Sequence, residues 1–297
     1  MQQDFSQITG RFAPTPSGPL HFGSLVTAVA SYCQARSSGG HWLLRIEDVD
    51  TPRVVKGASE LILHTLEAFG FEWDGEVVYQ SQRFDAYEEI LQHLIRQKHL
   101  YRCRCSRKQL NRENLISGPL GRIYPATCRH LNLLNPSLSL RLNLETAGRI
   151  RFNDAHYGKF ELDLSKQVGD VVLKRVDGIY AYHLAVVIDD NEQHINQIVR
   201  GSDLLEVSCI HLYLYQILGY QIPGYLHIPV VRSSDGNKLS KQTGATGLHN
   251  EHATIQLLDA LSFLGQQHCR EMISASPGEI LQHAIQHWNP ANLPAAN

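Results

Sequence analysis

The sequence has no long apolar run, and it has few cysteines for its length of 297 residues. No stretch of 18 apolar residues predicts a membrane-spanning helix, and the first residues are not a basic segment followed by an apolar one, as in a secretory signal. Six cysteines in so long a chain do not indicate a disulfide framework. We therefore expect a cytoplasmic protein in which clustered thiols bind metal or act in catalysis.

An excess of one charge sign is also missing. The chain has 27 Lys and Arg against 29 Asp and Glu, a net charge of -2, so no global positive field attracts nucleic acid. The absence of GxGxxG and GxxxxGK motifs argues against a nicotinamide enzyme and a P-loop ATPase. Sixteen histidines are scattered without an HExxH pair or a His/carboxylate cluster, so most are predicted to be surface or capping residues. With 43% hydrophobic residues, the chain can still form a buried core.

The first hundred residues have the pattern of half of a doubly wound sheet. Residues 8–14 predict a strand, a loop rich in proline and glycine follows, a helix begins near His21, and Trp42–Ile46 suits a buried strand. Strand, helix and strand in this order form a βαβ unit. Two further helices are predicted around residues 61–69 and 87–95.

The composition changes at residue 101. Between Tyr101 and His130 there are seven basic residues, one acid and three of the six cysteines. The apolar pattern resumes near residue 169, with strands predicted over 170–176, 179–188 and 225–231 and a helix near 204–218. We therefore predict an α/β fold with a Rossmann-type parallel sheet split by a zinc-containing insertion. The predicted parts are the first half of the catalytic domain (1–100), an inserted zinc-binding and RNA-contacting subdomain (101–168), the second half of the catalytic domain (169–245) and a C-terminal helical segment (246–297).

The strongest motif runs from Arg11 to Ser24, RFAPTPSGPLHFGS. A predicted strand leads through a proline-stiffened loop to a helix N-terminus, where unpaired N–H groups and the helix dipole favour an anion. His21 could donate to a phosphate, and Gly23 lets a flat ring approach the backbone. The alternative is a Pro/Gly-rich turn with an exposed histidine. The complete motif favours a nucleotide-phosphate site.

Three cysteines in the basic segment have the spacing of a metal site. Cys103, Cys105 and Cys128 would bind structural zinc if a fourth ligand completed a tetrahedron, and the spacing alone leaves Tyr124 and His130 open as that ligand. The alternative is three buried free thiols. The other three cysteines fall within helical patterns and are predicted to be packing residues: Cys33, Cys209 and Cys269.

The motif from Arg11 to Ser24 resembles the signature of class I aminoacyl-tRNA synthetases of the glutamyl and glutaminyl group, with HFGS in place of the His-Ile-Gly-His motif. Other segments of that family follow in the same order: RIEDVD from Arg45, residues 180–190, and RGSDLL from Arg200. KLSK from Lys238 resembles the Lys-Met-Ser-Lys-Ser motif, although alone it would be read as a solvated loop. The resemblance extends to about residue 245 and implies a ligase that forms an aminoacyl ester.

The resemblance implies a pocket for glutamate. Arg11 would pair with the side-chain carboxylate, and Glu47 would hold the ammonium group. Taken alone, Glu47 could be half of a surface ion pair with Arg45, and Tyr182 could be a core residue. The residues implied for glutamate binding are Arg11, Phe12, Ala13, Pro14, Thr15, Glu47, Tyr182 and Arg200.

For ATP with Mg²⁺, the resemblance implies His21 and Gly23 at the nucleotide and Lys241 near the reacting phosphates, with Lys238 in support. His21, Lys238 and Lys241 are therefore the expected catalytic residues. Attack of a carboxylate on the α-phosphorus needs charge neutralisation and alignment more than acid or base catalysis. This reaction needs no catalytic set of serine, histidine and aspartate.

The resemblance also bears on the metal. Members that keep a zinc module have Cys-x-Cys followed by Tyr-x-x-x-Cys, which selects Tyr124 as the fourth ligand beside Cys103, Cys105 and Cys128. We expect one structural zinc per chain.

The acceptor is the last question that the sequence raises. Only 56 residues follow Lys241, whereas a full-length glutamyl-tRNA synthetase continues into an anticodon-reading body of about 100 to 150 residues. Val186 also stands where full-length enzymes commonly have asparagine in the amino-acid pocket. The chain thus resembles short paralogues that activate glutamate without tRNA and esterify it to the queuosine base in the anticodon of tRNA(Asp). A truncated synthetase that charges the tRNA 3′ end and a catalytically silent RNA-binding paralogue are the alternatives. We expect a monomer.

Overall fold

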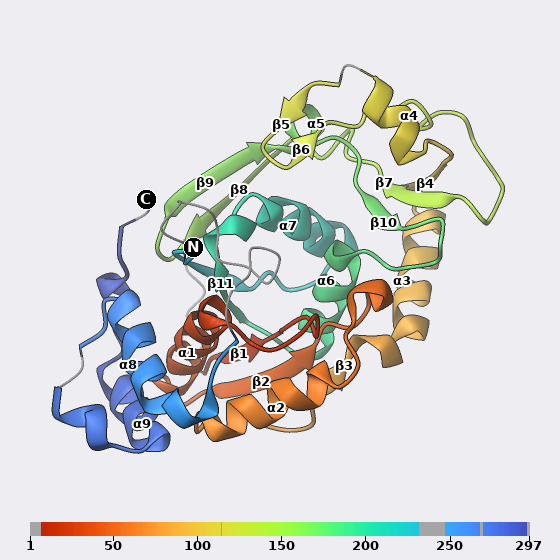
Figure 1. Ribbon diagram of the computed structural model, residues 1–297. Helices are drawn as coiled ribbons and strands as arrows, with labels where there is room; N and C mark the ends of the chain where they lie inside the picture. Colours follow the sequence, from red (N-terminus) through yellow and green to blue (C-terminus); the bar gives the residue numbers. More distant parts are fainter. Residues whose placement is uncertain (1–6, 114, 232–246, 268–269, 296–297) are drawn as a thin grey trace.

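The computed structural model describes residues 7–113, 115–231, 247–267 and 270–295 (Figure 1). The strands are β1 (Thr9–Phe12), β2 (His41–Ile46), β3 (Val78–Tyr79), β4 (Leu100–Cys103), β5 (Ser117–Gly118), β6 (Gly121–Arg122), β7 (Ser139–Leu142), β8 (Arg149–Asp154), β9 (Gly158–Asp163), β10 (Val172–Lys174), β11 (Gln197–Gly201) and β12 (Gly224–Ile228). The helices are α1 (Phe22–Arg36), α2 (Ala58–Ala68), α3 (Phe84–Arg96), α4 (Arg107–Arg112), α5 (Leu164–Gln167), α6 (Tyr182–Glu192), α7 (Val207–Leu218), α8 (Ala253–Phe263) and α9 (Pro277–His287).

The centre of the fold is a set of parallel strands. β1 pairs with β2 and β2 with β3, while β11 pairs with β12, all in parallel. Asn196, just before β11, joins the two groups: its backbone N–H donates to the Thr9 carbonyl (3.1 Å) and its Oδ1 accepts from the Thr9 N–H (2.8 Å). The resulting order, β3-β2-β1-β11-β12, is that of a Rossmann-type sheet, with its switch point between β1 and β11. The predicted α/β fold with a parallel sheet is confirmed.

Residues 101–168 contribute to three sheets, the smallest of which is the antiparallel pair β5–β6. β4, β7 and β10 form a separate antiparallel sheet, whereas the β8–β9 hairpin lies beside the central strands because β8 pairs in parallel with β12 at Asp154 and Tyr225. Figure 1 shows this long hairpin reaching from the region of β5 and β6 back toward β11. Through this hairpin, the segment over residues 101–168, which also contains the three clustered cysteines, is paired directly with the main sheet.

One predicted strand is wrong. From Tyr182 onward, the apolar run over residues 179–188 forms the start of helix α6, not a strand. Every residue from Leu184 to Asp190 is buried, so the run has no polar face and lacks the 3.6-residue alternation that identifies a surface helix. The strand predicted over 170–176 exists as β10, but it pairs antiparallel with β7 outside the central sheet.

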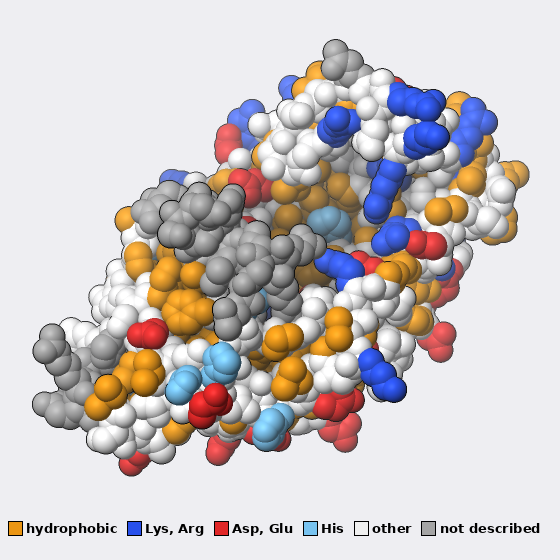
Figure 2. Space-filling view, viewed as in Figure 1, with side chains coloured by type: hydrophobic (Ala, Val, Ile, Leu, Met, Phe, Trp, Pro, Cys, Tyr) orange, Lys and Arg blue, Asp and Glu red, His pale blue; other side chains and the backbone are white. Residues whose placement is uncertain are grey.

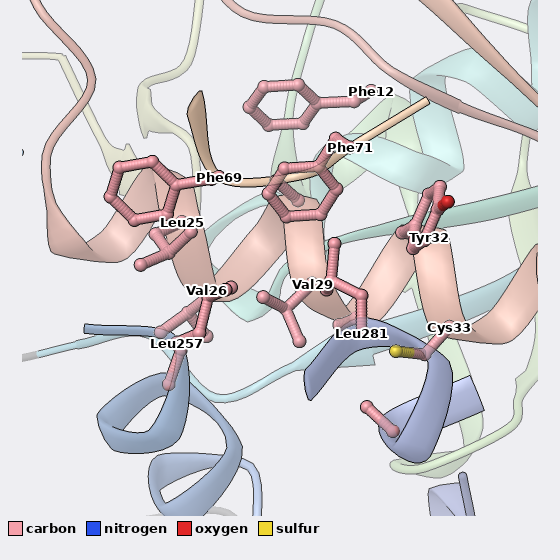
Figure 3. Packing of buried hydrophobic residues seen from close by; sticks show 14 of the residues in the cluster. Phe12, Leu25, Val26, Val29, Tyr32, Cys33, Phe69, Phe71, Leu257 and Leu281 are labelled. Carbon is pink, nitrogen blue, oxygen red and sulfur yellow. The ribbon is translucent and has the colours of Figure 1, made fainter. Parts of the chain in front are cut away.

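The core around α1 joins the C-terminal helices to the first sheet half. Figure 3 shows Leu25, Val26 and Val29 of α1 on the side of Leu257 in α8 and Leu281 in α9, while aromatic rings cover another side. Cys33 and Cys209 are fully buried packing residues, as predicted, and Cys269 lies outside the described residues. A capping box at Ser276 begins α9. None of the described helices has both the length and the hydropathy of a membrane span.

Candidate active site

A cleft of about 540 Å³ opens at the carboxyl ends of β1, β2, β11 and β12, where ligands bind in open α/β sheets. Figure 2 shows a hollow in this face of the molecule, below the part that contains α4. Lys238 and Lys241 lie outside the described residues. All the other residues predicted for glutamate and ATP line this single cleft: Arg11, Phe12, Ala13, Pro14, Thr15, His21, Gly23, Glu47, Tyr182 and Arg200.

The loop before α1 is fixed by its neighbours and by a cap. Backbone N–H groups of Glu47 and Val55 donate to the Pro14 and Pro16 carbonyls (3.0 and 2.9 Å). His21 is the N-cap of α1, and its Nδ1 accepts from the Ser24 N–H (3.2 Å). Since Nδ1 is an acceptor, the proton of the neutral ring is on Nε2. In this tautomer the ring has an Nε2–H that can donate.

Arg11 is held by a carboxylate that the sequence analysis did not single out. Its Nε and Nη2 donate to the two oxygens of Asp190 (3.0 and 3.3 Å), and Arg11 is only 4% exposed. Arg45 donates to the same carboxylate (2.7 Å) and to Gln193 Oε1 (2.6 Å). Asp190 and Gln193 belong to the end of α6, the element predicted as a strand. Two buried guanidinium groups thus share one aspartate beneath the cleft.

Glu47 lies against this group and is also buried. Its Oε1 is 3.5 Å from Arg45 Nη2, and Arg45 is fully buried, so the alternative of a surface ion pair is excluded. Burial raises the pKa of Glu47 to about 7 against the opposing effects of Arg45 and Arg11. Burial also opposes ionisation of Asp190, but Arg11 and Arg45 outweigh it and lower its pKa. Glu47 is therefore a carboxyl group that a cation in the cleft would ionise, whereas Asp190 is already charged.

Arg200, at the end of β11, has a different environment. Its Nε donates to His227 Nε2 (3.2 Å), its Nη1 to Tyr182 Oη and His211 Nδ1 (both 3.3 Å), and its Nη2 to Ser208 Oγ (2.8 Å). All these partners are neutral groups, and in the described part of the chain Arg200 has no salt bridge. A buried cation with neutral partners is suited to receive an anion from the cleft.

The histidines of this cluster are exceptions to the prediction that most histidines are surface or capping residues. His211 and His227 are at most 1% exposed, and His211 Nε2 lies 3.2 Å from His183 Nδ1. Because arginine only donates, the nitrogens that face Arg200 must be unprotonated acceptors. Burial, reinforced by the charge of Arg200, lowers the pKa of His183 to about 4 and that of His211 well below its usual value. The three rings are neutral around one guanidinium.

A buried His/carboxylate pair, which the sequence analysis did not find, extends this cluster. His227 Nδ1 lies 2.7 Å from Asp154 Oδ2, and Ser208 Oγ lies 3.0 Å from His227 Nε2. The arrangement has the connectivity of a hydrolase triad, but all three side chains are buried, and Ser208 Oγ accepts from Arg200 and lies within donating distance of the Leu204 carbonyl. No acyl group could reach this serine, so the set supports Arg200 instead.

Val186 does not line the cleft. It is 1% exposed and packs in the second hydrophobic core, one helical turn after Tyr182. The valine that replaces the asparagine common in full-length enzymes therefore lies in the core beneath the cleft.

The three clustered cysteines lie together in the described residues. Their sulfur atoms are within 4.8 Å of one another, and Tyr124 Oη is 3.2 Å from Cys103 Sγ and 3.4 Å from Cys105 Sγ. His130, the open alternative, is 75% exposed and faces Glu145, so the geometry favours Tyr124. Arg141 stacks 3.7 Å from the centre of the Tyr124 ring. Three thiols and a phenol converging on one point fit a tetrahedral zinc site.

Protonation of this group depends on whether a cation is present. In the protein alone, burial raises the pKa of Cys105 to about 11 and that of Tyr124 well above its usual value, with the neighbouring thiols adding to both. For Cys128, hydrogen bonds led by Tyr124 outweigh burial and lower the pKa. A bound divalent cation would favour the charged form of every ligand.

The basic segment presents most of its charge to solvent. Arg104, Arg107, Lys108, Arg112 and Arg122 are exposed. Arg129 is different, because it forms salt bridges with the buried Asp170 and with Glu145. Figure 2 shows Lys and Arg side chains gathered over the part with α4 and β4, next to the hollow.

The sheet order and the position of the cleft define an α/β enzyme that binds its substrates at the switch point of a Rossmann-type sheet. Residues 7–264 match the family model of class I tRNA synthetases (E and Q), catalytic domain. The chain therefore belongs to the class I tRNA synthetases of the glutamyl and glutaminyl group, and it is an enzyme of the ligase class.

Curated relatives align over almost the whole chain. A protein of Pseudomonas entomophila is 49% identical over 97% of this chain and 95% of its own length, and one of Pseudomonas syringae pv. tomato is 48% identical over 96% and 94%. Both are called glutamyl-Q tRNA(Asp) synthetase.

Solved structures give the same family. A glutamate tRNA ligase of Elizabethkingia meningosepticum, crystallised with its amino acid, has a TM-score of 0.80 and 25% identity and is matched by 98% of this chain. The glutamate-tRNA synthetase of Elizabethkingia anophelis has a TM-score of 0.79. The chain spans 66% and 68% of those two proteins, about two thirds of their length.

Proposed function

We propose that this enzyme activates glutamate with ATP in the absence of tRNA and then transfers glutamate to the queuosine base in the anticodon of tRNA(Asp). The observation that carries the proposal is the identity of 48 to 49%, over almost the whole chain, to relatives that are called glutamyl-Q tRNA(Asp) synthetase. The convergence of ten predicted site residues on one cleft supports the activation step. A truncated synthetase that charges the 3′ end would use the same cleft with a different acceptor.

Glutamate binding divides its charges among separate side chains. Arg11 already gives Nε–H and one Nη2–H to Asp190, so Nη1 and the second Nη2–H are the donors left for the side-chain carboxylate of glutamate. Glu47 would ionise beside the substrate ammonium, because a nearby cation favours the carboxylate form. Tyr182 and Arg200 complete the pocket. Phe12, Ala13, Pro14 and Thr15 shape its wall.

ATP would lie along the loop before α1. His21 and Gly23 line the cleft where the N-terminus of α1 favours phosphate. Mg²⁺ would accompany the phosphates as part of the substrate. The glutamate α-carboxylate attacks the α-phosphorus, its new P–O bond replaces the bond to pyrophosphate, and glutamyl-adenylate results. We assign Lys241, supported by Lys238, to the charge on the leaving pyrophosphate.

The exposed arginines of the basic segment would hold the RNA through its phosphates, which gives salt-dependent binding with little sequence information. Changing Arg104 and Arg107 together to alanine should leave glutamate activation intact, weaken transfer to RNA and flatten its salt dependence. Arg149 and Arg151, which are exposed on β8 and paired with Glu161, provide a matched double variant. Equal losses of transfer in the two double variants would contradict an RNA role for the basic segment.

The acceptor is tested by locating labelled glutamate on the RNA. Purified protein, ATP and labelled glutamate are incubated with tRNA(Asp) that carries either queuosine or guanine in the anticodon, and the product is digested to nucleotides. Label on the queuosine nucleotide, absent from the guanine tRNA, is expected. Label on the 3′-terminal adenosine would support the truncated synthetase. Activation without any transfer to RNA would also overturn the proposal.

We further propose that Cys103, Cys105, Tyr124 and Cys128 hold one structural zinc ion. When bound, zinc would cross-link β4 to the segment around residue 128 and stabilise this part of the fold. Metal analysis of protein prepared without chelator should find about one zinc per chain. Tyr124→Phe should weaken zinc retention, whereas His130→Ala should not. Protein without zinc, or equal zinc loss in both variants, would contradict this site.

A further inference from the structure

The hydrogen bonds that hold Arg200 extend beyond the residues that line the cleft. Arg200 Nε donates to His227 Nε2 (3.2 Å), and His227 Nδ1 lies 2.7 Å from Asp154 Oδ2. His227 is fully buried and Asp154 is 1% exposed. The chain of contacts thus runs from β11 through β12 to the last residue of β8.

We propose that Asp154 and His227 are positioning residues for Arg200, and that Asp154 does this by fixing the tautomer of His227. The inference rests on the proposed binding of glutamate beside Arg200. Neither residue lines the cleft, so they act only through the guanidinium.

The hydrogen-bond chemistry permits one tautomer. A guanidinium can only donate, so His227 Nε2 must be unprotonated where it meets Arg200. The ring proton is then on Nδ1 and is donated to Asp154, a carboxylate that can only accept. The opposite tautomer would place the Nε2 proton against the Nε proton of Arg200 and leave Nδ1 without a donor at Asp154.

Asp154 is itself held rigidly. Its Oδ1 accepts the backbone N–H groups of His156 and Tyr157 (3.0 and 2.9 Å) in the turn between β8 and β9. Its Oδ2 accepts the His227 backbone N–H (3.0 Å) in addition to the ring. With four donors around two oxygens, the carboxylate cannot rotate away from the histidine. The orientation of the β8–β9 turn therefore determines the position of Arg200.

The first test exchanges the carboxylate for an amide. In Asp154→Asn, Oδ1 can still accept from the turn, but the amide nitrogen replaces Oδ2 and faces both the ring and the backbone N–H of His227 as a donor, which should also lower stability. The ring must take the opposite tautomer and repel Arg200, so the KM for glutamate in ATP/pyrophosphate exchange should rise about tenfold or more. The KM for ATP should stay close to that of the parent.

Asp170→Asn is the matched control. Asp170 is also a buried aspartate (2% exposed) whose carboxylate accepts from the Arg129 guanidinium, the Tyr101 hydroxyl and a backbone N–H, but it lies in the β7–β10 region, away from Arg200. Its exchange should lower stability without raising the KM for glutamate. If Asp154→Asn is folded and its KM for glutamate equals that of Asp170→Asn, the inference is wrong.

A second pair of variants covers the case in which Asp154→Asn does not fold. In His227→Gln the side-chain oxygen can replace Nε2 as the acceptor, whereas His227→Leu removes the acceptor at similar size. The glutamine variant should keep the KM for glutamate within about threefold of the parent, and the leucine variant should raise it about tenfold. Equal KM values in the two variants would overturn the inference.

Nitrogen NMR of the parent protein reads the tautomer directly. With ¹⁵N-labelled histidine, the signal lost in His227→Gln should have a protonated Nδ1 and an unprotonated Nε2. The reverse assignment would contradict the positioning mechanism even if glutamate is not the substrate. Absence of glutamate-dependent exchange in the parent would instead refute the proposed function.

Discussion

Arg11 and Arg200 have the same burial but different partners. Each is 4% exposed, each is the penultimate residue of a parallel strand and each lines the cleft. Arg11 shares the Asp190 carboxylate with Arg45, whereas Arg200 is surrounded by imidazoles and hydroxyls. The charge of Arg11 is thus largely compensated within the protein, and that of Arg200 is available to an incoming anion. We infer that the first network, Arg11 with Asp190 and Arg45, mainly holds the pocket together. The second network, Arg200 with its imidazole and hydroxyl partners, mainly attracts substrate.

The largest effect should come from removing the compensating charge of the first network. Asp190→Asn leaves Arg11 and Arg45 buried without their shared carboxylate, and we expect the free energy of unfolding to fall by about 3 to 5 kcal/mol in urea denaturation. Glu161→Gln, which breaks exposed ion pairs on β9, should leave it nearly unchanged. Similar losses for the two variants would remove the distinction between the networks.

The second-largest effect should be the pH dependence of the free energy of unfolding, which differs between the two networks. His183 has a folded pKa of about 4 against 6.5 in the unfolded chain, so the unfolded state binds more protons between these values. Stability should therefore fall as pH decreases from about 6.5 to 4, by up to about 1.4 kcal/mol per pH unit for each such histidine. Asp190, whose pKa is lowered, reduces the free energy of unfolding only when the pH falls below the usual pKa range of an aspartate.

His183→Gln isolates the histidine contribution, since glutamine can still accept from His211. The raised pKa of Glu47 acts in the opposite direction over the same range, and it is common to both proteins. The difference in unfolding free energy between parent and variant should therefore change with pH between about 6.5 and 4. A pH-independent difference would mean that burial and the charge of Arg200 do not hold His183 neutral.

A change within the second network should affect substrate binding more than folding. Arg200→Lys keeps the charge but has three donors on one nitrogen, too few to reach His227, Tyr182 and Ser208 together. The KM for glutamate should rise about tenfold or more, with a smaller loss of stability than in Asp190→Asn. An unchanged KM would show that glutamate does not depend on this guanidinium.

The smallest effect should be the pH dependence of glutamate binding through Glu47. Because its pKa is raised to about 7, the carboxylate that holds an ammonium group is formed only as pH rises through that value. The KM for glutamate should fall between pH 6 and 8 by less than about tenfold per unit, and Glu47→Gln should make it higher and flatter. A parent profile as flat as that of the glutamine variant would contradict the role of Glu47.

The sequence was most informative where the chemistry is contiguous. The segment from Arg11 to Ser24 places a strand end, a loop and a helix cap in one motif, and the structure has all three. The support of Arg200 could not be predicted, because Asp154, Ser208 and His227 come from three distant elements and have no common spacing. Asp190 was missed for another reason: α6 is buried on all sides, so no polar face marked it as a helix that presents carboxylates to Arg11.

The most direct test of the central claim is ATP/pyrophosphate exchange with purified protein and no RNA, comparing glutamate with aspartate and glutamine. The side-chain carboxylate of glutamate would meet Arg11 and its ammonium group Glu47, while glutamine lacks the charge and aspartate is one methylene shorter. We predict exchange that depends on glutamate, with little from the other two. Exchange that needs tRNA, or that is equal for the three amino acids, would contradict the account.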